Sequence, residues 1–495
     1  MSDGIIIAID QGTSSTKAVG IDANGMIVDT VKVPLAHSSP QPGWVEQDAE
    51  EILRTVVEAL NTIANRAEQR VLTIGISSQR ESALVWDRIG GDPVGPMLGW
   101  QDRRTNPQAA EMLAAGLGTE VRSRTGLPLD PMFSALKWQW LLDQLDEQRT
   151  LTRSGRLVLG TVDAWLRWKL CGDVAIEEGN ASRTQLYNIN SGTWDQELCG
   201  LFNIPYECLA PIVPSDAISS PVHAGTAVDG VPIAGVMGDS HAALFGHGVR
   251  VPGSVKATFG TGSSIMGLAD KDIPEGSGMA HTIAWSIAGI RQRAFEGNIL
   301  SSGATVAWLA EVMHCTPDVL AEEAATVQSS RGLVMVPAFS GLGAPWWDDA
   351  ATGIICGLGL GQRRPHFGRA AFESIAHQIA DVLESADEAS GQYIDRVLAD
   401  GGPTRNDWLM GLVARLTGRE VIRADVTELS AFGVATLAGQ TLGVWSPEEV
   451  EALYRPHTSF NPTPVGAYSA ATIDTFAAER ERWREALARA RLRPA

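Results

Sequence analysis

The chain has 495 residues, of which 44% are hydrophobic and 20% are charged. At roughly 100–200 residues per domain, this length predicts two to four domains, each with its own core. The formal net charge of −19 and the lack of a long basic run argue against a duplex-binding protein, because phosphate backbones are held by clustered Lys and Arg. We therefore expect no nucleic-acid partner.

The spacing of the cysteines and the shortness of the apolar runs predict a cytoplasmic protein. No apolar run reaches about eighteen residues, so the sequence predicts neither a membrane span nor a membrane partner. The cysteines show no CxxC or Cys/His ligand spacing, which favours reduced packing residues and leaves zinc as the alternative. They are Cys171, Cys199, Cys208, Cys315 and Cys356.

The first elements form a predicted meander of three strands. The run Ile5 to Ile9 is β-branched and continuous, which is typical of a strand buried on both faces. Asp10 ends the run, and a polar turn leads to a second apolar stretch from Ala18 to Ile21. After a turn, Met26 to Val33 predicts the third strand. The first hairpin therefore carries glycine and hydroxyl groups at its tip.

The rest of the chain alternates helical and strand patterns. Helices are expected at residues 49–66 and 134–145, and strands at 71–77 and 157–159. Near the middle, residues 254–259, a Gly/Thr turn and residues 265–268 repeat the opening hairpin. This repeat suggests two related α/β halves. Turn residues between 246 and 253 set the expected domains at 1–248 and 249–495.

Two Gly-rich turns have the composition of phosphate-binding loops. The turn from Asp10 to Lys17 offers backbone N–H groups and hydroxyls, which hold phosphate oxygens without excess positive charge, and its carboxylate suits Mg²⁺. An ordinary hairpin with an Asp-capped turn explains the same residues. Gly260-Thr261-Gly262 repeats the device. No GxxxxGK[ST] sequence is present, so the turns indicate a two-lobed ATPase or kinase of actin-like type.

A third glycine pair follows the apolar run Val397 to Ala399. Asp400-Gly401-Gly402 lets the backbone approach a ligand closely, and Asn406 can hydrogen-bond a purine edge. Taken alone, this segment is also explained by a plain turn.

Asp239 and the pair Arg80 and Glu81 have residue types suited to an alcohol acceptor. Asp239 follows an apolar run, as expected of a strand-end base that accepts the proton of an attacking hydroxyl. A helix N-cap is the structural alternative for Asp239. Arg80 and Glu81 offer donors and acceptors for vicinal hydroxyls, and a surface ion pair is the alternative there.

Ordered motifs along the chain resemble the FGGY carbohydrate kinases, and among them the glycerol kinase branch. The resemblance extends from about residue 5 to about residue 490, and residues 132–144 and 353–373 fit the two signature stretches of the family. The motifs are residues 9–17, 42–48, 79–82, 100–105, 160–165, 180–184, 238–239, 341–345 and 400–402.

The resemblance implies a fold and a set of site residues. The fold is two actin-like, ribonuclease-H-like α/β domains around a central cleft, with the acceptor and first phosphate loop in the N-terminal domain and nucleotide binding in the other. Asp10 would organise Mg²⁺, and Asp239 would be the base. The acceptor would meet Arg80, Glu81, Trp100, Met132, Asp239 and Ser240. ATP would lie against Gly12, Thr13, Ser14, Ser15, Thr261, Gly262, Gly303, Gly402 and Asn406. A homodimer or homotetramer is also implied.

Three positions depart from the pattern of the glycerol-phosphorylating members. Met132 replaces a tyrosine, Ser240 a glutamine and Ser264 a phenylalanine, which predicts a roomier and differently polar acceptor pocket. We expect ATP-dependent phosphorylation of a primary hydroxyl of glycerol or a closely related small polyol. A four- or five-carbon polyol or ketose is the alternative acceptor. A nucleotide-driven actin-like switch and a binding protein without catalysis are the alternatives to a kinase.

Overall fold

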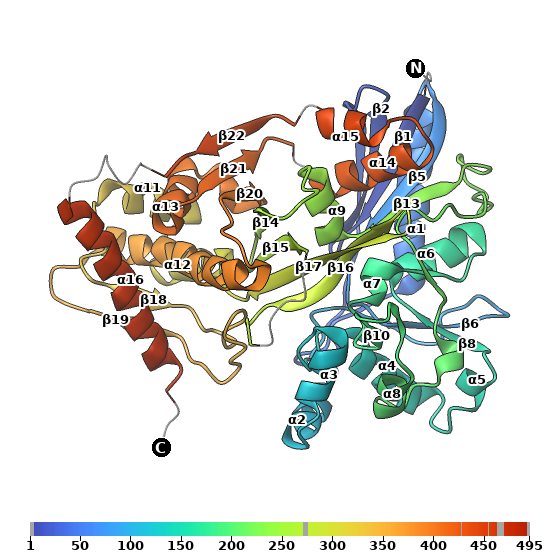
Figure 1. Ribbon diagram of the computed structural model, residues 1–495, viewed down its shortest axis with the longest axis horizontal. Coiled ribbons are helices and arrows are strands. Elements are labelled where there is room, and N and C mark those ends of the chain that lie inside the picture. The colour runs from blue at the N-terminus through green and yellow to red at the C-terminus, as the bar shows by residue number, and fades with distance from the viewer. Residues whose placement is uncertain (1–3, 271–275, 427, 454, 463–469, 493–495) are drawn as a thin grey trace. The chain divides into compact units, whose positions relative to one another are not determined.

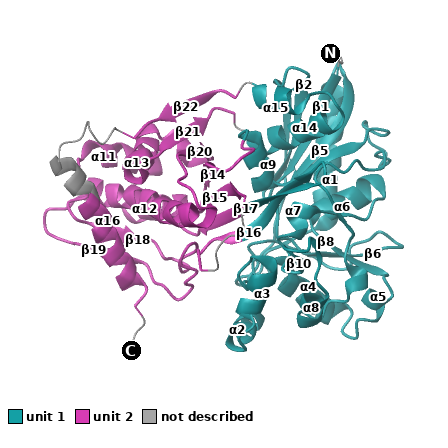
Figure 2. Cartoon of the chain, viewed as in Figure 1, with its two compact units in different colours: residues 1–248, 281–294, 428–454 teal, residues 249–280, 295–427, 455–495 magenta. Residues whose placement is uncertain are grey.

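The computed structural model describes residues 4–270, 276–426, 428–453, 455–462 and 470–492 (Figure 1). These residues belong to two compact units (Figure 2). Unit 1 consists of Met1–Gly248, His281–Ala294 and Glu428–Tyr454. Unit 2 consists of Val249–Ala280, Phe295–Thr427 and Arg455–Ala495.

Unit 1 includes two segments that lie beyond the predicted boundary at residue 248. Within the second of them, α14 (Leu429–Thr441) packs against strands of the unit 1 sheet and against α9 (Asp239–Gly246). Long-range packing of this kind leaves no local signal in the sequence. The domain limits 1–248 and 249–495 stay a prediction.

The core of unit 1 is a five-stranded sheet with the order β13-β5-β1-β2-β3. β1 pairs antiparallel with β2 and β2 with β3, which confirms the predicted meander, whereas β1 and β13 both run parallel to β5. The strands are β1 (Gly4–Gln11), β2 (Ser15–Asp22), β3 (Ile27–Pro34), β5 (Arg70–Ser78) and β13 (Ile233–Gly238).

β1 is buried on both faces, as its continuous apolar run predicts. Ile5, Ile7 and Ile9 share a core cluster with α1 (Ala49–Arg66). On β5, a Cβ at Gly75 would lie 2.7 Å from the carbonyl oxygen of Val434 in α14, so the glycine permits this helix to approach the sheet. Helices on both faces explain why the strand shows no polar alternation.

The remaining elements of unit 1 are short strands and helices (Figure 1). The strands pair as β4 (Glu46–Gln47) with β7 (Met97–Leu98), β6 (Leu84–Asp87) with β8 (Leu157–Gly160), β9 (Ile176–Glu177) with β12 (Ile212–Val213), and β10 (Tyr187–Asn188) with β11 (Thr193–Trp194). The helices are α2 (Asn106–Ala114), α3 (Gly118–Thr125), α4 (Ser134–Leu145), α5 (Thr150–Arg153), α6 (Val162–Cys171), α7 (Glu178–Ala181), α8 (Gln196–Leu201), the 3₁₀ turn η1 (Tyr206–Cys208) and α15 (Pro447–Ala452).

Unit 2 is built on a sheet with the order β16-β17-β15-β14-β20-β21-β22. β14 pairs antiparallel with β15 and parallel with β20, and β20 pairs parallel with β21. The strands are β14 (Ser254–Phe259), β15 (Ser263–Ala269), β16 (Ala280–Ile287), β17 (Ile290–Ile299), β20 (Arg396–Asp400), β21 (Glu420–Ala424) and β22 (His457–Phe460), of which β16 and β17 also carry residues 281–294 of unit 1.

The long helix α12 (Arg364–Ser390) is largely buried and organises the helical part of unit 2. It packs against α10 (Gly303–Val312), α11 (Pro317–Thr326) and α13 (Asp407–Thr417). The remaining elements are β18 (Val334–Val336), β19 (Ile354–Cys356), the 3₁₀ turn η2 (Gly402–Arg405) and α16 (Ala470–Ala490).

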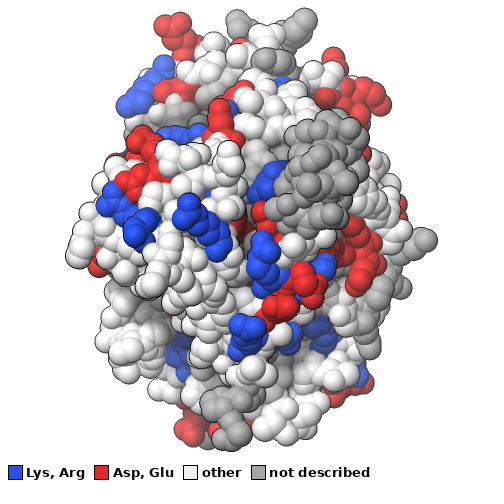
Figure 3. All heavy atoms as spheres, turned by 90° about the vertical axis from the view of Figure 1, so that its left-hand side faces the viewer, with Lys and Arg blue, Asp and Glu red and all other residues white. Residues whose placement is uncertain are grey.

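Surface charge and helix composition bear on the partner predictions. On the face of the molecule in Figure 3, acidic and basic side chains are interspersed among the described residues, without a separate basic patch. In the part of the chain that the structure describes, no helix has both the length and the apolar character needed to cross a membrane.

Candidate active site

Three parallel strands of unit 1 end in register and bring together the predicted metal residue and two of the predicted acceptor residues. Gln11 at the end of β1 and Gly238 at the end of β13 are both aligned with Ser78 at the end of β5. Asp10, Arg80 and Asp239 therefore lie together at the carboxyl ends of these parallel strands, which we call the strand-end edge of the unit 1 sheet. In open α/β sheets, ligands bind outside the carboxyl ends of the strands, and this edge is such a position.

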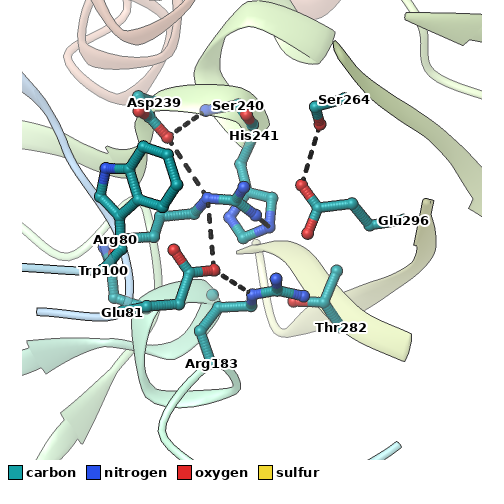
Figure 4. Close-up of polar contacts among 12 residues, drawn as sticks. Arg80, Glu81, Trp100, Arg183, Asp239, Ser240, His241, Ser264, Thr282 and Glu296 are labelled. Atoms are coloured by element: carbon teal, nitrogen blue, oxygen red, sulfur yellow. Dashed lines mark hydrogen bonds and ion pairs between the residues drawn. The ribbon is translucent and has the colours of Figure 1, made fainter. Parts of the chain in front are cut away.

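Asp239 is the first residue of α9. Its Oδ1 accepts hydrogen bonds from the backbone N–H of Ser240 at 2.7 Å and from Nε of Arg80 at 3.3 Å (Figure 4). Helix α9 begins at Asp239 itself, so its N-cap is Gly238. The N-cap role considered for Asp239 is therefore wrong. The side chain of Asp239 is 41% exposed, so the carboxylate is accessible to a ligand.

Arg80 and Glu81 are buried, in contrast to the surface ion pair that their sequence alone suggests. Their side chains are 7% and 6% exposed, and Arg80 Nε lies 3.9 Å from Oε1 of Glu81. That oxygen also accepts a bond of 2.5 Å from Nε of Arg183. The backbone of Glu81 has φ of 55°, a left-handed conformation that surrounding contacts must hold in a non-glycine residue.

Asp10 is a half-buried carboxylate in a charged neighbourhood. Its Oδ1 accepts a hydrogen bond from Ser77 at 3.1 Å. Burial, and secondarily the negative charge of Asp239, raise the pKa of Asp10 to about 6, although Lys17 acts in the opposite direction. The ammonium of Lys17 contacts Glu428 at 2.5 Å, so a residue far along the chain also reaches this loop.

The hairpin between β1 and β2 forms a tight polar tip. The backbone N–H of Gly12 donates to the carbonyl of Ser15 at 3.0 Å, and the exposed Ser14 lies between them. Thr13 is held on both sides, since its carbonyl accepts from Gln47 at 2.8 Å and its hydroxyl accepts from the indole N–H of Trp100 at 3.2 Å. The first predicted phosphate loop and a predicted acceptor residue are thus in direct contact.

The two unit 1 positions that depart from the family pattern are both half-buried. Met132 follows Asp130, whose carboxylate accepts the backbone N–H of Met132 at 2.7 Å. Ser240 follows Asp239 and donates its N–H to that side chain. Met132 therefore lies in a turn next to the Asp130 carboxylate, and Ser240 lies in the first turn of α9 next to the Asp239 carboxylate.

In unit 2, the hairpin between β14 and β15 is shorter by one residue, since Phe259 pairs with Ser263 whereas Gln11 pairs with Thr16 in unit 1. The N–H of Gly260 donates to the carbonyl of Gly262 at 2.8 Å, and the exposed Thr261 forms the tip. A Cβ at Gly303 would lie 2.5 Å from the carbonyl oxygen of Gly260, so glycine lets α10 begin directly against the hairpin. The N–H groups of Ser302 and Ala304 donate to the carbonyl of Thr261 and fix this junction.

Unit 2 contains a cavity of about 700 Å³ that is lined by three of the residues predicted to bind the nucleotide. Gly303, Gly402 and Asn406 all line it. Its volume is in the range of small-molecule and cofactor sites. Asn406 caps α13, because its Oδ1 accepts from the backbone N–H of Leu409 at 3.0 Å. Phe372 and Trp408 form an edge-to-face aromatic pair in the wall.

Ser264, the third departure from the family pattern, has a buried carboxylate as a partner. Its hydroxyl donates to Oε1 of Glu296 at 3.0 Å, and Glu296 is 0% exposed (Figure 4). Both residues lie on neighbouring strands of unit 2, β15 and β17. A hydroxyl and a carboxylate therefore occupy a position where the family pattern has a ring.

Sequence reasoning missed Arg183, His241, Glu296 and Glu428 as members of these clusters. His241 is buried, and its Nε2 lies 3.5 Å from Nη1 of Arg80. The segment 180–184 carried a motif signal, but the contact of Arg183 with Glu81 joins residues about 100 positions apart. Glu296 and Glu428 gave no local signal, since their neighbours come from distant strands and loops.

Comparison with known proteins identifies the family. The N-terminal domain profile of the FGGY family of carbohydrate kinases matches residues 5–246, and its C-terminal domain profile matches residues 255–442. The chain is 40% identical over 501 residues to an apulose kinase of Pectobacterium atrosepticum, with 99% of each chain covered. It is also 40% identical over 474 residues to a glycerol kinase of Chromobacterium violaceum, covering 93% of this chain and 94% of the relative.

A solved structure supports the same assignment. The crystal structure of Plasmodium falciparum glycerol kinase with ADP matches with a TM-score of 0.93 and 27% identity, covering 100% of this chain and 99% of the other. The predicted fold class of two actin-like α/β domains is thereby confirmed. The chain belongs to the FGGY family of carbohydrate kinases.

Proposed function

We propose that this protein transfers the γ-phosphate of ATP to a primary hydroxyl of glycerol or a closely related small polyol. The observation that carries the proposal is the strand-end edge of the unit 1 sheet, where Asp10, Arg80 and Asp239 lie together. A phosphoryl transfer needs a base, a bound acceptor and neutralised phosphates, and this edge supplies groups for each.

Asp239 is the proposed base. Its carboxylate accepts the proton of the attacking hydroxyl as the new O–P bond forms, and the bond between the γ-phosphorus and the leaving oxygen breaks to release ADP. Arg80 orients the carboxylate through its contact with Oδ1. Glu81, fixed by Arg183, accepts hydrogen bonds from acceptor hydroxyls, and Trp100 covers the carbon chain.

The residues proposed to bind ATP are on one hairpin of each unit and in the unit 2 cavity. Backbone N–H groups and hydroxyls at Gly12, Thr13, Ser14 and Ser15, and at Thr261 and Gly262, suit phosphate oxygens. Gly303, Gly402 and Asn406 would border the adenosine, since all three line the cavity. A kinase relative solved with ADP supports nucleotide use.

The residues around Asp10 fit a magnesium ion. Burial, and secondarily repulsion from the Asp239 carboxylate, raise the pKa of Asp10, and a divalent cation would relieve this repulsion. In the described ranges, no group of three or more His, Cys, Asp or Glu side chains is arranged to hold a metal ion, so phosphates and waters would complete the shell. When bound, Mg²⁺ neutralises developing phosphate charge.

A four- or five-carbon polyol or ketose is the second candidate acceptor. Ser264 favours it, because its half-buried hydroxyl, held by the buried Glu296, can bind an additional acceptor hydroxyl where the family pattern has a phenylalanine. The relatives do not separate the candidates, since an apulose kinase and a glycerol kinase are both 40% identical to this chain.

Initial-rate kinetics with coupled ADP detection test both acceptors. The panel runs from glycerol through erythritol and xylitol to pentuloses and apulose. We expect ADP release to depend on the acceptor, and a best kcat/KM for glycerol by orders of magnitude would reject the second candidate. The Ser264→Phe variant should weaken only the larger acceptors if the second candidate holds.

The same assay distinguishes a kinase from a nucleotide-driven switch. ADP release at one rate with and without every acceptor on the panel would favour an actin-like switch and contradict the proposal. Phosphorylated product, identified by mass spectrometry, would support the kinase directly.

A further inference from the structure

Lys137 is a fully buried lysine bonded to three backbone carbonyls. It lies on α4 and is 0% exposed. Its Nζ donates to the carbonyl oxygens of Glu81 at 2.5 Å, Met132 at 2.6 Å and Gly99 at 3.0 Å. An ammonium group has three N–H donors, so each donor has one acceptor.

The three carbonyls belong to three separate segments of unit 1. Glu81 and Met132 are themselves proposed acceptor residues, and Gly99 directly precedes Trp100, the third. Glu81 and Gly99 lie 56 and 38 positions from Lys137 in the sequence, so no short-range structure keeps them together. One ammonium therefore joins the backbones of all three segments.

We propose that Lys137 is a positioning residue that holds these three acceptor-binding segments in one arrangement and thereby sets the affinity for the acceptor. The inference rests on the proposed function, because the acceptor roles of Glu81, Trp100 and Met132 do. Lys137 touches the backbone of these segments, and it acts on the acceptor through them.

Packing alone does not explain a charge at this position. An apolar side chain of similar length would fill the same volume without the cost of desolvating an ammonium. The carbonyl of Glu81 is an informative acceptor, since this residue has φ of 55° and needs outside contacts to keep that conformation. Lys137 holds its backbone, while Arg183 holds its carboxylate.

Neighbouring residues of α4 provide a matched comparison. Ser134 donates to the carbonyl of Ser82 at 2.8 Å, and the indole N–H of Trp138 donates to the carbonyl of Leu84 at 3.2 Å. Both bonds fix the same helix to the segment after Glu81. Neither bond reaches the segments of Gly99 and Met132, so Trp138→Phe removes a helix contact without breaking the three-way link.

The three-way link depends on protonation. Burial lowers the pKa of Lys137 to about 7, against the raising effect of Glu81, Asp102 and Asp130, while Arg103 also lowers it. A neutral amine has two N–H donors, so one carbonyl loses its partner. The link is therefore complete below about pH 7 and loosens as the pH rises through that value.

Kinetics of Lys137→Met and Trp138→Phe test the proposal on the best acceptor of the panel. For Lys137→Met we expect the acceptor KM to rise about 10- to 100-fold, with ATP affinity within about twofold of wild type, because the segments lose their alignment. For Trp138→Phe we expect an acceptor KM close to wild type. An unchanged KM in Lys137→Met, or the same rise in both variants, would overturn the proposal.

Amide hydrogen exchange gives a readout that does not depend on kinase activity. Residues 99–103 and 130–133 should exchange faster in Lys137→Met than in Trp138→Phe, and equal exchange would contradict the link even if no acceptor is phosphorylated. If Lys137→Met does not fold, the wild type carries the test. Its acceptor KM should rise from pH 6.5 to 8.5 while its ATP KM stays level, and a level acceptor KM would overturn the proposal.

Discussion

The two units share a strand order but differ in the chemistry at their strand ends. In unit 1 the order β2-β1-β5-β13 has one antiparallel and two parallel pairings, and in unit 2 the order β15-β14-β20-β21 has the same pairings. Unit 1 ends its strands in charged side chains, including Asp10, Arg80 and Asp239. Unit 2 ends its strands in glycine turns beside a cavity, where Gly303 and Gly402 lie.

Under the proposed function, this difference corresponds to a division of roles between two copies of one topology. Charged groups with fixed partners suit the recognition of hydroxyls and the transfer of a proton. Glycine turns bring backbone N–H groups close to a ligand and leave room for a large one. Variants that affect one step and spare the other are therefore the sharpest way to test the comparison.

The largest expected effect is in unit 1. Asp239→Asn keeps an oxygen that can accept from Arg80 and Ser240, so the site geometry should survive, while the proton acceptor is lost. We expect kcat to fall by about 10²–10⁴-fold. ATP affinity, measured by calorimetry with a non-hydrolysable analogue, should stay near wild type. A variant with wild-type kcat would show that Asp239 is not the base.

In unit 2 we expect a smaller effect, which falls on ATP affinity and leaves the acceptor KM unchanged. In Gly303→Ala the new Cβ would lie 2.5 Å from the carbonyl oxygen of Gly260 and displace the hairpin tip. We expect weaker ATP binding, measured by the same calorimetry, because the displaced hairpin tip no longer presents its N–H groups in place; overpacking the junction also costs folding stability on the order of 1–3 kcal/mol.

Gly411→Ala is the control for the unit 2 variant. Gly411 lies within α13, and a Cβ there would meet nothing within 4 Å. Its ATP affinity should equal that of wild type. Equal losses of ATP affinity in Gly303→Ala and Gly411→Ala would mean that Gly303 does not lie nearer to the bound nucleotide than Gly411 does. A raised acceptor KM in Gly303→Ala would contradict the division between the units.

Local structure was predictable from the sequence wherever neighbouring residues decide it. The helices predicted at 49–66 and 134–145 have these bounds in the structure, because the apolar spacing is regular and Asp48 caps the first. The continuous apolar run of β1 was also sufficient to predict burial on both faces. In such elements the signal and its cause lie within a few residues of each other.

Features that depend on distant partners were not predictable in this way. Arg80 and Glu81 look like a surface pair, but β5 is an inner strand of the sheet and Arg183 reaches Glu81 from about 100 residues away. In the sequence, Lys137 differs from its neighbours only as the one lysine in a helix with many apolar residues. Its three carbonyl partners become visible only in the fold.

The smallest expected effect concerns the pH dependence of unit 1 stability through Asp10. The pKa of Asp10 is raised to about 6 in the folded protein from an ordinary value of 3.8. Between these values the unfolded chain has lost the proton and the folded chain keeps it, so stability falls as the pH rises through this window. The destabilisation is absent below 3.8 and complete above 6.

Asp10→Asn removes this ionisation and should be more thermostable than wild type at neutral pH without Mg²⁺. The difference in Tm, measured by differential scanning calorimetry, should shrink towards zero as the pH falls from 7 to 4. In Ser77→Ala, which lacks the hydrogen bond that lowers the pKa of Asp10, the fall in stability should begin at the same pH and extend to a higher pH. With Mg²⁺ and ADP the order should reverse, because the wild-type carboxylate holds the ion more strongly than a neutral amide does. A Tm difference that does not change with pH would mean that Asp10 titrates normally, and the strand-end edge of the unit 1 sheet would then need no cation to stabilise it.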